Sequence, residues 1–418
     1  MRRMPFVLGL LAVLAMLQAC APPENALLRI NLAHLNHLYD RVELKNDGSA
    51  SIIYIYAEYP DYRPVVAQGE GFTCADDIAR AAVVYERYGR YFNDFAATQK
   101  ARQLVRTLLK LQADNGCFYN FLRKDGTIEK HNRNSQPLPD WWTWRSFWAL
   151  AEFGLHHRQT DKALTDSVRL AVQRVRPYIE ALAREQGKFE TVRGFRLPVW
   201  LPQKYGADQA SILLNAMVSA FRWTGDSSWV PLMRAQVKGL LAVQVNDAAS
   251  PVNGMFLSWK NFWHAYGNSQ ADALLAYFEI SGDSAAYRAA LREIDSFYPF
   301  LIRQGYLHAL TLTRRNGRVS IEQKIRFEQI AYDFRPAIWA CLRAYRLSGA
   351  KKYLERARKF LAWFSGDNAA HRAMYEAQTG RCFDGILSPQ KINLNAGAES
   401  TIEALLSLLE MQRIRIMP

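Results

Sequence analysis

The sequence predicts an all-α fold in which six helical hairpins close into a ring, an (α/α)6 toroid of twelve helices, with short β-strands in the loops. Two observations lead to this prediction. A unit made of an amphipathic helix, a short apolar stretch opened by glycine, a polar loop and a more apolar second helix recurs six times. Within these units, the turn glycines and the polar residues that begin the second helices return at similar spacings.

The first unit is expected to contain a helix over residues 26–39, a strand over residues 51–57 and a second helix over residues 76–88. The strands of the six units open at glycines that are 51 to 75 residues apart: Gly48, Gly116, Gly187, Gly254, Gly305 and Gly380. The starts of the second helices carry polar residues that are 60 to 68 positions apart: Asp77, Asp140, Asp208, Asn268, Asp333 and Glu399.

The two helices of a unit differ in where their apolar residues lie. First helices such as TQKARQLVRTLLKLQ have one charged side, which indicates an outer ring in contact with water. Second helices such as ASILLNAMVSAF are apolar nearly all round, which indicates an inner ring. Five second helices end in similar short sequences that contain a glycine, and each glycine predicts a left-handed C-cap: Gly89, Gly154, Gly225, Gly282 and Gly349. In such a ring, the starts of all inner helices gather at one end.

Residues 1–19 are predicted to be a lipoprotein signal peptide. Arg2 and Arg3 precede an apolar run, residues 6–17, that is too short to span a bilayer. The run ends in LQAC, which resembles a bacterial lipobox and predicts lipidation of Cys20. Residues 20–25 are then a tether and residues 26–418 a single toroid domain, on the periplasmic face of a bacterial membrane, with the outer membrane expected. Secretion with an unmodified Cys20 is the alternative.

The composition supports a large core and a basic surface. Half of the residues are hydrophobic and 12% are aromatic, so disorder is not expected. The formal charge of +14 favours anionic partners such as lipid headgroups or acidic polysaccharide. Nucleic acid is not expected as a partner, because the basic residues are scattered along helices and form no recognition motif. Four further cysteines allow three disulfide pairings, and their spacing matches no metal site: Cys74, Cys117, Cys341 and Cys382. No metal or cofactor is expected.

Several segments resemble one protein family. The stretches YDFRPAIWACLRAYRLSGAKKYLERARKFLAWFSGDN, YEAQTGRCFDGI and INLNAGAESTIEALLSLLEM look like the C-terminal half of six-hairpin glycosidase-like proteins that accompany bacterial glycosyltransferases. GFTCADDIARA and WRSFWALAEFG resemble the first two inner-helix motifs of that family. The likeness covers nearly the whole mature chain and is weakest between residues 160 and 300. It implies an α/α toroid that handles polysaccharide or oligosaccharide.

Glycoside hydrolysis needs one carboxyl that donates a proton and a second that acts as nucleophile or base. The starts of the inner helices supply five candidates: Asp76, Asp77, Asp208, Asp333 and Glu399. A helix cap explains one of the two adjacent aspartates, and Asp76 precedes Arg80 by four residues, so Asp77 is the preferred catalytic residue of that pair. Glu399 is a poor N-cap, which favours a functional role. Asp140 is more readily explained as a cap.

Aromatic and polar residues near the same starts could bind a sugar. Tryptophan rings can stack on sugar rings, and Trp142, Trp200 and Trp263 are the candidates, with Trp259 close to the last of them. The alternative is that tryptophan fills the core. Polar candidates for sugar binding are Arg145, His264, Asn268, Arg335, Asp384, Asn393 and Asn395. Asp384 could instead belong to an Asp-Gly turn.

Three functions follow from these residues. The first is a glycoside hydrolase acting on bacterial envelope or exported polysaccharide. The second is a lyase acting on uronates, with His264 or Tyr266 as base and Arg145 or Asn268 neutralising the sugar carboxylate. The third is a non-catalytic glycan-binding lipoprotein of a polysaccharide synthesis or export system, in which the tryptophans matter and the carboxyls do not.

Overall fold

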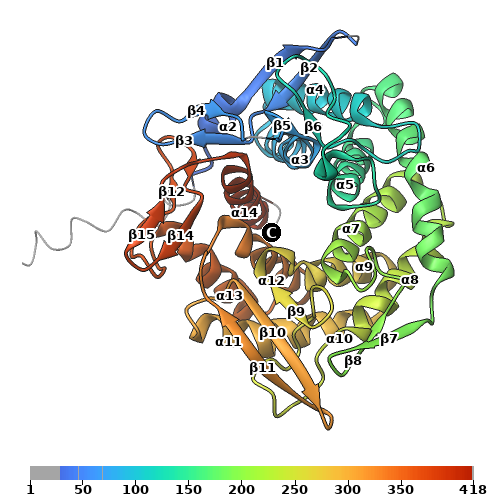
Figure 1. The fold of residues 1–418 in the computed structure, drawn as a ribbon, viewed down its shortest axis with the longest axis vertical. Coiled ribbons are helices and arrows are strands. Elements are labelled where there is room, and N and C mark those ends of the chain that lie inside the picture. Colours follow the sequence, from blue (N-terminus) through green and yellow to red (C-terminus); the bar gives the residue numbers. More distant parts are fainter. Residues whose placement is uncertain (1–28, 46, 68, 417–418) are drawn as a thin grey trace, which may run out of the picture.

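The computed structural model describes residues 29–416 except 46 and 68, and these residues form a ring of helices around a central axis (Figure 1). Six inner helices surround the axis: α3 (Ala75–Phe92), α5 (Trp141–His157), α7 (Ala207–Thr224), α9 (Gln270–Ser281), α12 (Arg335–Ser348) and α14 (Ala398–Ile416). An outer helix precedes each of them: α2 (Ala33–Leu38), α4 (Phe95–Leu111), α6 (Lys162–Arg184), α8 (Trp229–Ala242), α10 (Ser284–Arg292) with α11 (Tyr298–Arg303), and α13 (Lys351–Leu361). The π-helical turn η3 (Glu293–Phe297) joins α10 to α11.

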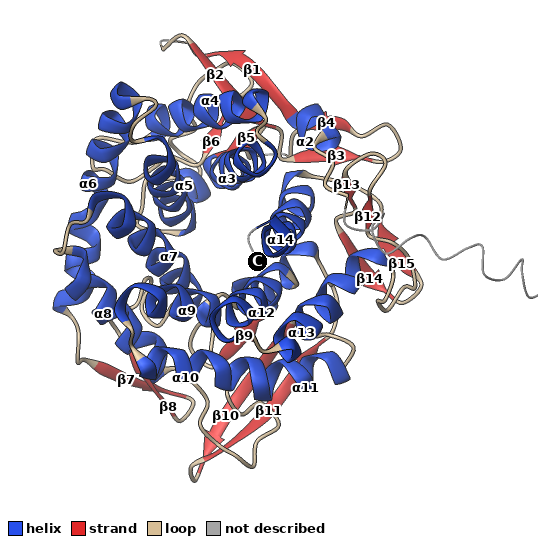
Figure 2. Cartoon of the chain, turned by 180° about the vertical axis from the view of Figure 1, so that it is seen from behind, coloured by secondary structure: helices blue, strands red, loops and turns tan. Residues whose placement is uncertain are grey.

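The inner ring is closed. Each inner helix packs against the next one along the chain, and the last, α14, packs against the first, α3 (Figure 2). Every outer helix that follows an inner helix also packs against it, as α4 does on α3 and α13 does on α12. These contacts confirm the predicted (α/α)6 toroid.

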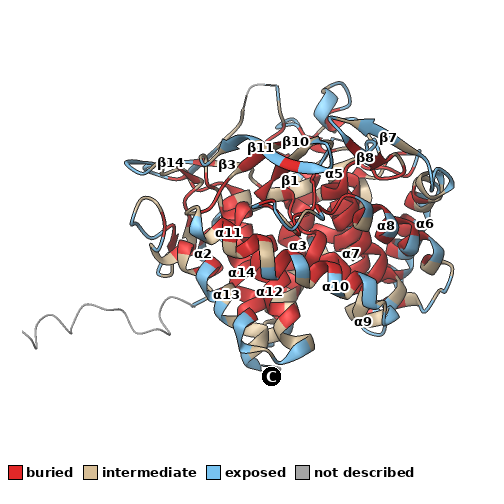
Figure 3. Cartoon of the chain, turned by 90° about the horizontal axis from the view of Figure 1, so that it is seen from below, coloured by how far each residue is buried: buried red, intermediate tan, exposed pale blue. Residues whose placement is uncertain are grey.

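Burial follows the two sequence patterns. Inner helices are buried almost all round, and α14 is buried from Ser400 to Met411 without interruption. Outer helices are buried along one stripe, which on α4 includes Ala97, Ala101, Leu104, Leu108 and Leu111. The core therefore lies between the two rings (Figure 3). Each leucine buried there contributes roughly 1.5–3 kcal/mol of stabilisation.

Short antiparallel strand pairs occupy the long connections from outer to inner helices, at one face of the ring (Figure 3). The pairs are β1 (Tyr39–Glu43) with β2 (Ser49–Ile53), β3 (Tyr56–Glu58) with β4 (Arg63–Val65), β5 (Thr73–Cys74) with β6 (Phe121–Leu122), β7 (Phe189–Val192) with β8 (Phe195–Pro198), β12 (Tyr375–Glu376) with β13 (Arg381–Cys382), and β14 (Gly385–Ser388) with β15 (Lys391–Asn393). One sheet has three strands, β9 (Phe262–His264), β10 (Ala309–Arg315) and β11 (Arg318–Ile325). All six predicted turn glycines have positive φ, from 60° at Gly48 to 96° at Gly187.

The first unit differs from its prediction. Its outer helix is only α2 rather than residues 26–39, because the chain enters β1 at Tyr39 and pairs with β2 around the Gly48 turn. The predicted strand over residues 51–57 is divided between β2 and β3. The predicted inner helix over residues 76–88 is longer, since α3 continues to Phe92.

Three of the five predicted glycine C-caps are confirmed, because Gly225, Gly282 and Gly349 end their helices in the left-handed conformation. The other two are wrong, since Gly89 and Gly154 lie inside α3 and α5. They permit close packing instead. A Cβ on Gly154 would lie 2.6 Å from the Trp223 ring.

The predicted signal peptide, the lipidated Cys20 and the tether fall within residues 1–28, outside the described residues. Cys74, Cys117, Cys341 and Cys382 are buried free thiols, so none of the three possible pairings is formed. Among the helices that the structure describes, none is both long and apolar enough to cross a membrane.

Candidate functional site at the N-terminal ends of the inner helices

The structure brings the predicted helix starts to one end of the ring. Asp77 and Asp208 lie in the first turns of α3 and α7, and Glu399 is the second residue of α14. Asp333 ends the 3-10 turn η4 (Ala331–Asp333) before α12. Asn268 follows the turn η2 (Ala265–Gly267) before α9 and is buried. Positive partial charge at the helix N-termini favours carboxylates at this end.

Arg80 of α3 contacts four carboxylates, three of which, Asp76, Asp77 and Glu399, are among the predicted catalytic residues. Its guanidinium donates to Asp77 Oδ1 at 2.6 Å and lies 3.6 Å from Asp76 Oδ2. It also donates across the ring closure, to Glu399 Oε2 at 3.0 Å and Glu403 Oε1 at 2.9 Å on α14. Because Arg80 is buried, these contacts supply the charge neutralisation that burial requires.

Asp77, the preferred catalytic residue, is enclosed. Its Oδ1 accepts from Arg80 and its Oδ2 accepts from the Cys74 thiol at 3.2 Å. Burial raises the pKa of Asp77 to about 6, although the charge of Arg80 opposes this shift. Neither of the adjacent aspartates caps α3, because the Asp77 backbone N–H donates to Cys74 Sγ. The geometry therefore gives Asp77 a supporting position beneath Arg80.

Glu399 has a different environment, since its side chain is 45% exposed. The turn before it is held by Asp384, whose Oδ1 accepts from the Gly397 backbone N–H at 2.8 Å and from the Ser400 hydroxyl at 2.6 Å. Burial raises the pKa of Asp384. Asp384, a predicted sugar-binding residue, thus fixes the segment that presents Glu399.

The two asparagines of the same segment also bond to the protein. Asn393 Oδ1 accepts from the Asn395 backbone N–H at 3.2 Å. Asn395 Oδ1 accepts from the Tyr59 backbone N–H at 3.1 Å, which connects the segment to the first unit. The polar residues before α14 therefore stabilise the turn that carries Glu399.

Two histidine–aspartate pairs lie beside the carboxylates. His264 Nε2 lies 3.0 Å from Asp208 Oδ2, and His308 Nδ1 lies 3.2 Å from Asp333 Oδ2. The Tyr266 ring contacts both imidazoles, with centroids 3.8 Å from His264 and 5.7 Å from His308. His264 is buried, whereas His308 is partly exposed. The pairs can therefore hold or transfer protons next to one aromatic ring.

Electrostatics of the His308–Asp333 pair favour a protonated group near neutral pH. Burial raises the pKa of Asp333 to about 6, while the nearby His308 opposes the shift. Burial alone lowers the pKa of His308, but the hydrogen bond and charge of Asp333 outweigh it and raise that pKa overall. His308 was not among the predicted site residues, because it belongs to neither the glycine nor the acidic repeat. Its nearest sequence signal is its position three residues after the turn glycine Gly305.

Arginines and one tyrosine complete the site. The guanidiniums of Arg80, Arg145 and Arg335 lie 5.5, 5.3 and 4.8 Å from the centroid of the buried Tyr332 ring. Arg145 donates to the Tyr332 hydroxyl at 2.8 Å and pairs with Asp76. Arg335 pairs with Glu403. Both arginines, predicted to bind sugar hydroxyls, are thus engaged by protein groups.

The tryptophans predicted to stack on sugar lie in the core instead. Trp142, Trp200 and Trp263 are all buried. The indole N–H of Trp142 donates to the Phe118 carbonyl at 2.8 Å and that of Trp200 to the Ala235 carbonyl at 2.9 Å. Trp142 lies in the first turn of α5, whereas Trp200 and Trp263 lie in strand-bearing connections that pack onto the ring. A position ahead of or at the start of an inner helix therefore did not indicate exposure.

Trp259 is the exposed tryptophan of this region, with 40% of its surface accessible. Its indole N–H donates to the Lys204 carbonyl at 2.9 Å, which fixes the ring. The preceding residue, Ser258, accepts at its carbonyl from Asp208 N, and its hydroxyl accepts from His264 N at 3.0 Å. Trp259 therefore stands on the turn that positions the His264–Asp208 pair.

Asp140 is the N-cap of α5, as expected from its place before the helix, and its Oδ1 accepts from Trp141 N at 2.8 Å.

Within the part of the chain that the structure describes, no three His, Cys, Asp or Glu side chains are placed to hold a metal ion.

Solved structures share this architecture. Cellobiose 2-epimerase from Spirochaeta thermophila DSM 6192 superposes with a TM-score of 0.61 at 15% identity, covering 98% of this chain and 100% of that chain. Cellobiose 2-epimerase from Bacillus thermoamylovorans B4167 gives 0.61 at 13% identity, covering 93% and 97%. A family 76 glycoside hydrolase from a bovine Bacteroides thetaiotaomicron strain gives 0.58 at 11% identity, covering 94% and 76%.

The chain is an (α/α)6 toroid. The sequence matches no family profile, and no curated protein resembles it in sequence. At the identities found, the structural likeness establishes the fold, and the proteins that share it are carbohydrate-active enzymes, epimerases and glycoside hydrolases among them.

Proposed function

We propose that this protein is a carbohydrate-active enzyme that hydrolyses a glycosidic bond in bacterial envelope or exported polysaccharide, by acid–base catalysis at the N-terminal ends of the inner helices. The observation that carries the proposal is the contrast between Glu399 and its neighbours. Its carboxylate reaches the surface at the ring opening, whereas Asp77 and Glu403 are buried against the same arginine. The carbohydrate-active enzymes that share the fold support the substrate class.

Glu399 is the base in this proposal. Its Oε2 accepts a hydrogen bond from Arg80 at 3.0 Å, and it lies in the first turn of α14. His308 is the acid, because Asp333 favours its protonated form and its ring is partly exposed. His308 gives its proton to the glycosidic oxygen, which leaves with the bonding electrons. Water adds to the anomeric carbon and loses its proton to Glu399, so one bond is cleaved for each water consumed.

Substrate binding is assigned to the exposed aromatic surface. A sugar ring would stack on Trp259, whose indole N–H is already bound and whose position is therefore fixed. Trp141, at the first position of α5, is half-buried, and the Arg145 guanidinium lies 5.1 Å from its ring. Asp77 and Glu403 act indirectly, by holding Arg80 beneath Glu399.

Epimerisation is a second candidate reaction, favoured by the two histidine–aspartate pairs whose imidazoles both lie next to the Tyr266 ring. One group would remove the proton next to the carbonyl of a ring-opened sugar and the other would return a proton to the opposite face. The two reactions differ in products. Hydrolysis generates new reducing ends, whereas epimerisation in heavy water introduces deuterium at the epimerised carbon without chain cleavage.

The lyase hypothesis has less support. Burial raises the pKa of Tyr266 to about 12, and the charges of Asp208, Asp333 and Glu399 add to the shift. The tyrosinate that would abstract a uronate proton is thereby disfavoured.

The decisive experiment measures reducing ends released from envelope and exported polysaccharides by wild type, Glu399→Gln and Glu376→Gln. Glu376 is a matched control, because its side chain is 35% exposed and pairs with Arg381 at the outer rim. We expect Glu399→Gln to lose activity and Glu376→Gln to keep it. Equal activity in wild type and Glu399→Gln refutes the assignment, and glycan binding without turnover by wild type favours the non-catalytic alternative.

For localisation, we propose anchoring through lipidated Cys20 on the periplasmic face of the outer membrane, beside polysaccharide synthesis or export proteins. Its support is the LQAC sequence after a short apolar run. Incorporation of labelled palmitate by wild type and its loss in Cys20→Ser test the anchor. A membrane-free Cys20→Ser protein with unchanged activity would show that anchor and catalysis are separate.

A further inference from the structure

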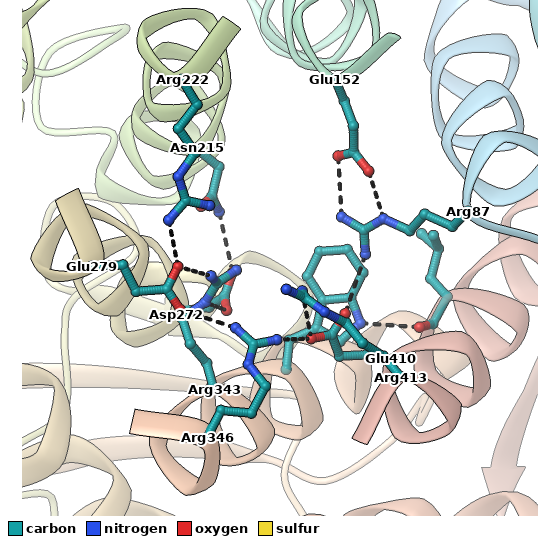
Figure 4. Close-up of polar contacts among 12 residues, drawn as sticks. Arg87, Glu152, Asn215, Arg222, Asp272, Glu279, Arg343, Arg346, Glu410 and Arg413 are labelled. Atoms are coloured by element: carbon teal, nitrogen blue, oxygen red, sulfur yellow. Dashed lines mark hydrogen bonds and ion pairs between the residues drawn. The ribbon is translucent and has the colours of Figure 1, made fainter. Parts of the chain in front are cut away.

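The opposite end of the ring contains a second polar cluster, around a cavity of about 120 Å³ (Figure 4). All six inner helices line this cavity. Its cationic residues come from four of them, with Arg87 and Arg90 on α3, Arg222 on α7, Arg343 on α12 and Arg413 on α14. This arrangement differs from the candidate active site, where carboxylates predominate.

Positive charge exceeds negative charge in the cluster. With Arg346, which bonds to two of its carboxylates, the cluster holds six arginines. Four carboxylates oppose them: Glu152, Asp272, Glu279 and Glu410. Six positive and four negative charges leave a formal excess of two, a charge that one dianion would balance.

The interior arginines are satisfied by protein partners (Figure 4). Arg87 donates to both oxygens of Glu152, at 2.6 and 3.1 Å. Arg343 donates to Asp272 at 2.7 Å and to Glu279 at 3.1 Å. These bidentate and bridging contacts hold the inner helices together at this end of the ring and leave few N–H groups of Arg87 and Arg343 free.

The arginines at the rim retain free donors. Arg222 donates to Glu279 through one nitrogen, at 2.6 Å, and Arg413 donates to Glu410 through one nitrogen, at 3.3 Å. Arg90 is exposed and has no carboxylate within ion-pair distance among the described residues. Three guanidiniums around one cavity therefore have N–H groups available to a ligand.

Burial is the main cause of the pKa shifts of two groups in the cluster. His156, which lines the cavity, has its pKa lowered to about 4, mainly by burial; Arg90 lowers it further, while Glu152 and Glu86 oppose the shift. Burial also lowers the pKa of Arg346, with Glu410 opposing the shift and Arg343 and Arg413 adding to it. The His156 imidazole is therefore neutral and adds no charge to the cluster.

We propose that this cavity is an oxyanion site that binds a phosphate-class dianion, either free phosphate or a phosphate monoester, between Arg90, Arg222 and Arg413. Guanidinium donors match the oxygens of phosphate in geometry as well as in charge. The site lies at the end of the ring opposite to Glu399, so it is independent of the proposed hydrolysis. The arginines lie near the C-terminal ends of inner helices, where positive charge is favourable even without a ligand. Saturable binding would distinguish a ligand site from this purely structural role.

The test compares thermal stability and calorimetric binding in inorganic phosphate with those in sodium chloride of equal ionic strength. Matching the ionic strength removes general screening. We expect saturable stabilisation by phosphate in wild type. Arg90→Gln and Arg413→Gln should each weaken phosphate binding about tenfold. Arg63→Gln, which changes the same charge at a side chain that is 82% exposed near the strand face, should bind like wild type.

The choice of Arg90 keeps the test interpretable, because this exposed side chain has no carboxylate partner among the described residues and its replacement should not unfold the ring. Glucose 6-phosphate, compared with inorganic phosphate, distinguishes a monoester from the free ion. The proposal would be overturned if phosphate stabilised the protein no more than chloride does. It would also be overturned if phosphate binding were unchanged in both Arg90→Gln and Arg413→Gln. The arginines would then serve only in ion pairs and at helix ends.

Discussion

Arg80 of α3 and Glu399 of α14 form a hydrogen bond of 3.0 Å where the first and last inner helices meet. The same guanidinium donates to Glu403, one turn further along α14, at 2.9 Å. The two glutamates share a partner but differ in exposure, which is 45% for the Glu399 side chain and 0% for that of Glu403. In the proposed function, Glu399 contacts the substrate and Glu403 supports Arg80.

Substitution of the two glutamates should therefore separate activity from stability. Glu403→Gln removes a buried charge that pairs with Arg80 and Arg335, so we expect a loss of about 3–5 kcal/mol in the free energy of unfolding. Glu399→Gln should change that free energy by about 1 kcal/mol or less, but lower turnover by about 10²-fold or more. Urea denaturation and reducing-end assays measure the two effects. The opposite ranking in either assay would contradict these roles.

The Asp333–His308 pair predicts a specific pH response. Asp333 raises the pKa of His308, so the acid form of the imidazole persists to higher pH. The alkaline limb of kcat/KM should therefore lie above pH 6.5, the ordinary value for histidine. Asp333→Asn removes the charge and should move this limb to lower pH by about one unit.

Asp208→Asn is the control for that experiment, because Asp208 bonds to His264 and not to His308. Its alkaline limb should remain where it is in wild type. A limb that stays in place in Asp333→Asn would remove His308 as the acid, whatever the loss of total activity.

Trp259 should control the use of long substrates. Trp259→Ala removes an exposed, fixed ring, and we expect KM for oligosaccharides that reach it to rise about tenfold, with little change in kcat. Phe95→Ala is the control, because Phe95 is a highly exposed aromatic residue that starts α4 at the other end of the ring. Equal KM values for Trp259→Ala and Phe95→Ala at every substrate length would exclude stacking on Trp259.

Glu293 should link stability to pH. This residue of the π-turn η3 is fully buried, its Oε1 accepts from Phe256 N at 3.1 Å, and burial raises its pKa to about 8. The folded protein thus retains a proton that the unfolded chain releases near pH 4.5. The free energy of unfolding should then fall by on the order of 3 kcal/mol as pH rises from 5 to 8.

Glu293→Gln tests this linkage, since the amide does not titrate. Its unfolding free energy, measured in urea at pH 5, 6.5 and 8, should vary less with pH than that of wild type. Parallel pH curves for the two proteins would show that Glu293 does not titrate in the folded state in this range.

The features predicted best from the sequence are those set by local chain geometry. Gly187 and Gly254 open strand turns with positive φ, and the apolar periodicity of α4 and α14 separates outer from inner helices. The failures arise where tertiary packing decides. Gly154 has the sequence context of a helix end but lies inside α5 because Trp223 packs against it.

The sequence predicted where the candidate site lies better than it predicted what each side chain does there. The start of α14 was identified from Glu399, but its partner Arg80 lies 319 residues away and no local pattern connects them. Burial of Trp263 and partial exposure of His308 likewise depend on how the strand-bearing loops fold onto the ring. Side-chain roles at such a site require the three-dimensional contacts.

Closure of the ring by α14 has a consequence for folding. This helix supplies both Glu399 and the surface that packs against α3 and α12. Until α14 docks, the flanks of α3 and α12 are uncovered and the Arg80 charge lacks its α14 partners. A chain cut before Ala398 should therefore form an open, aggregation-prone arc rather than a weakened enzyme.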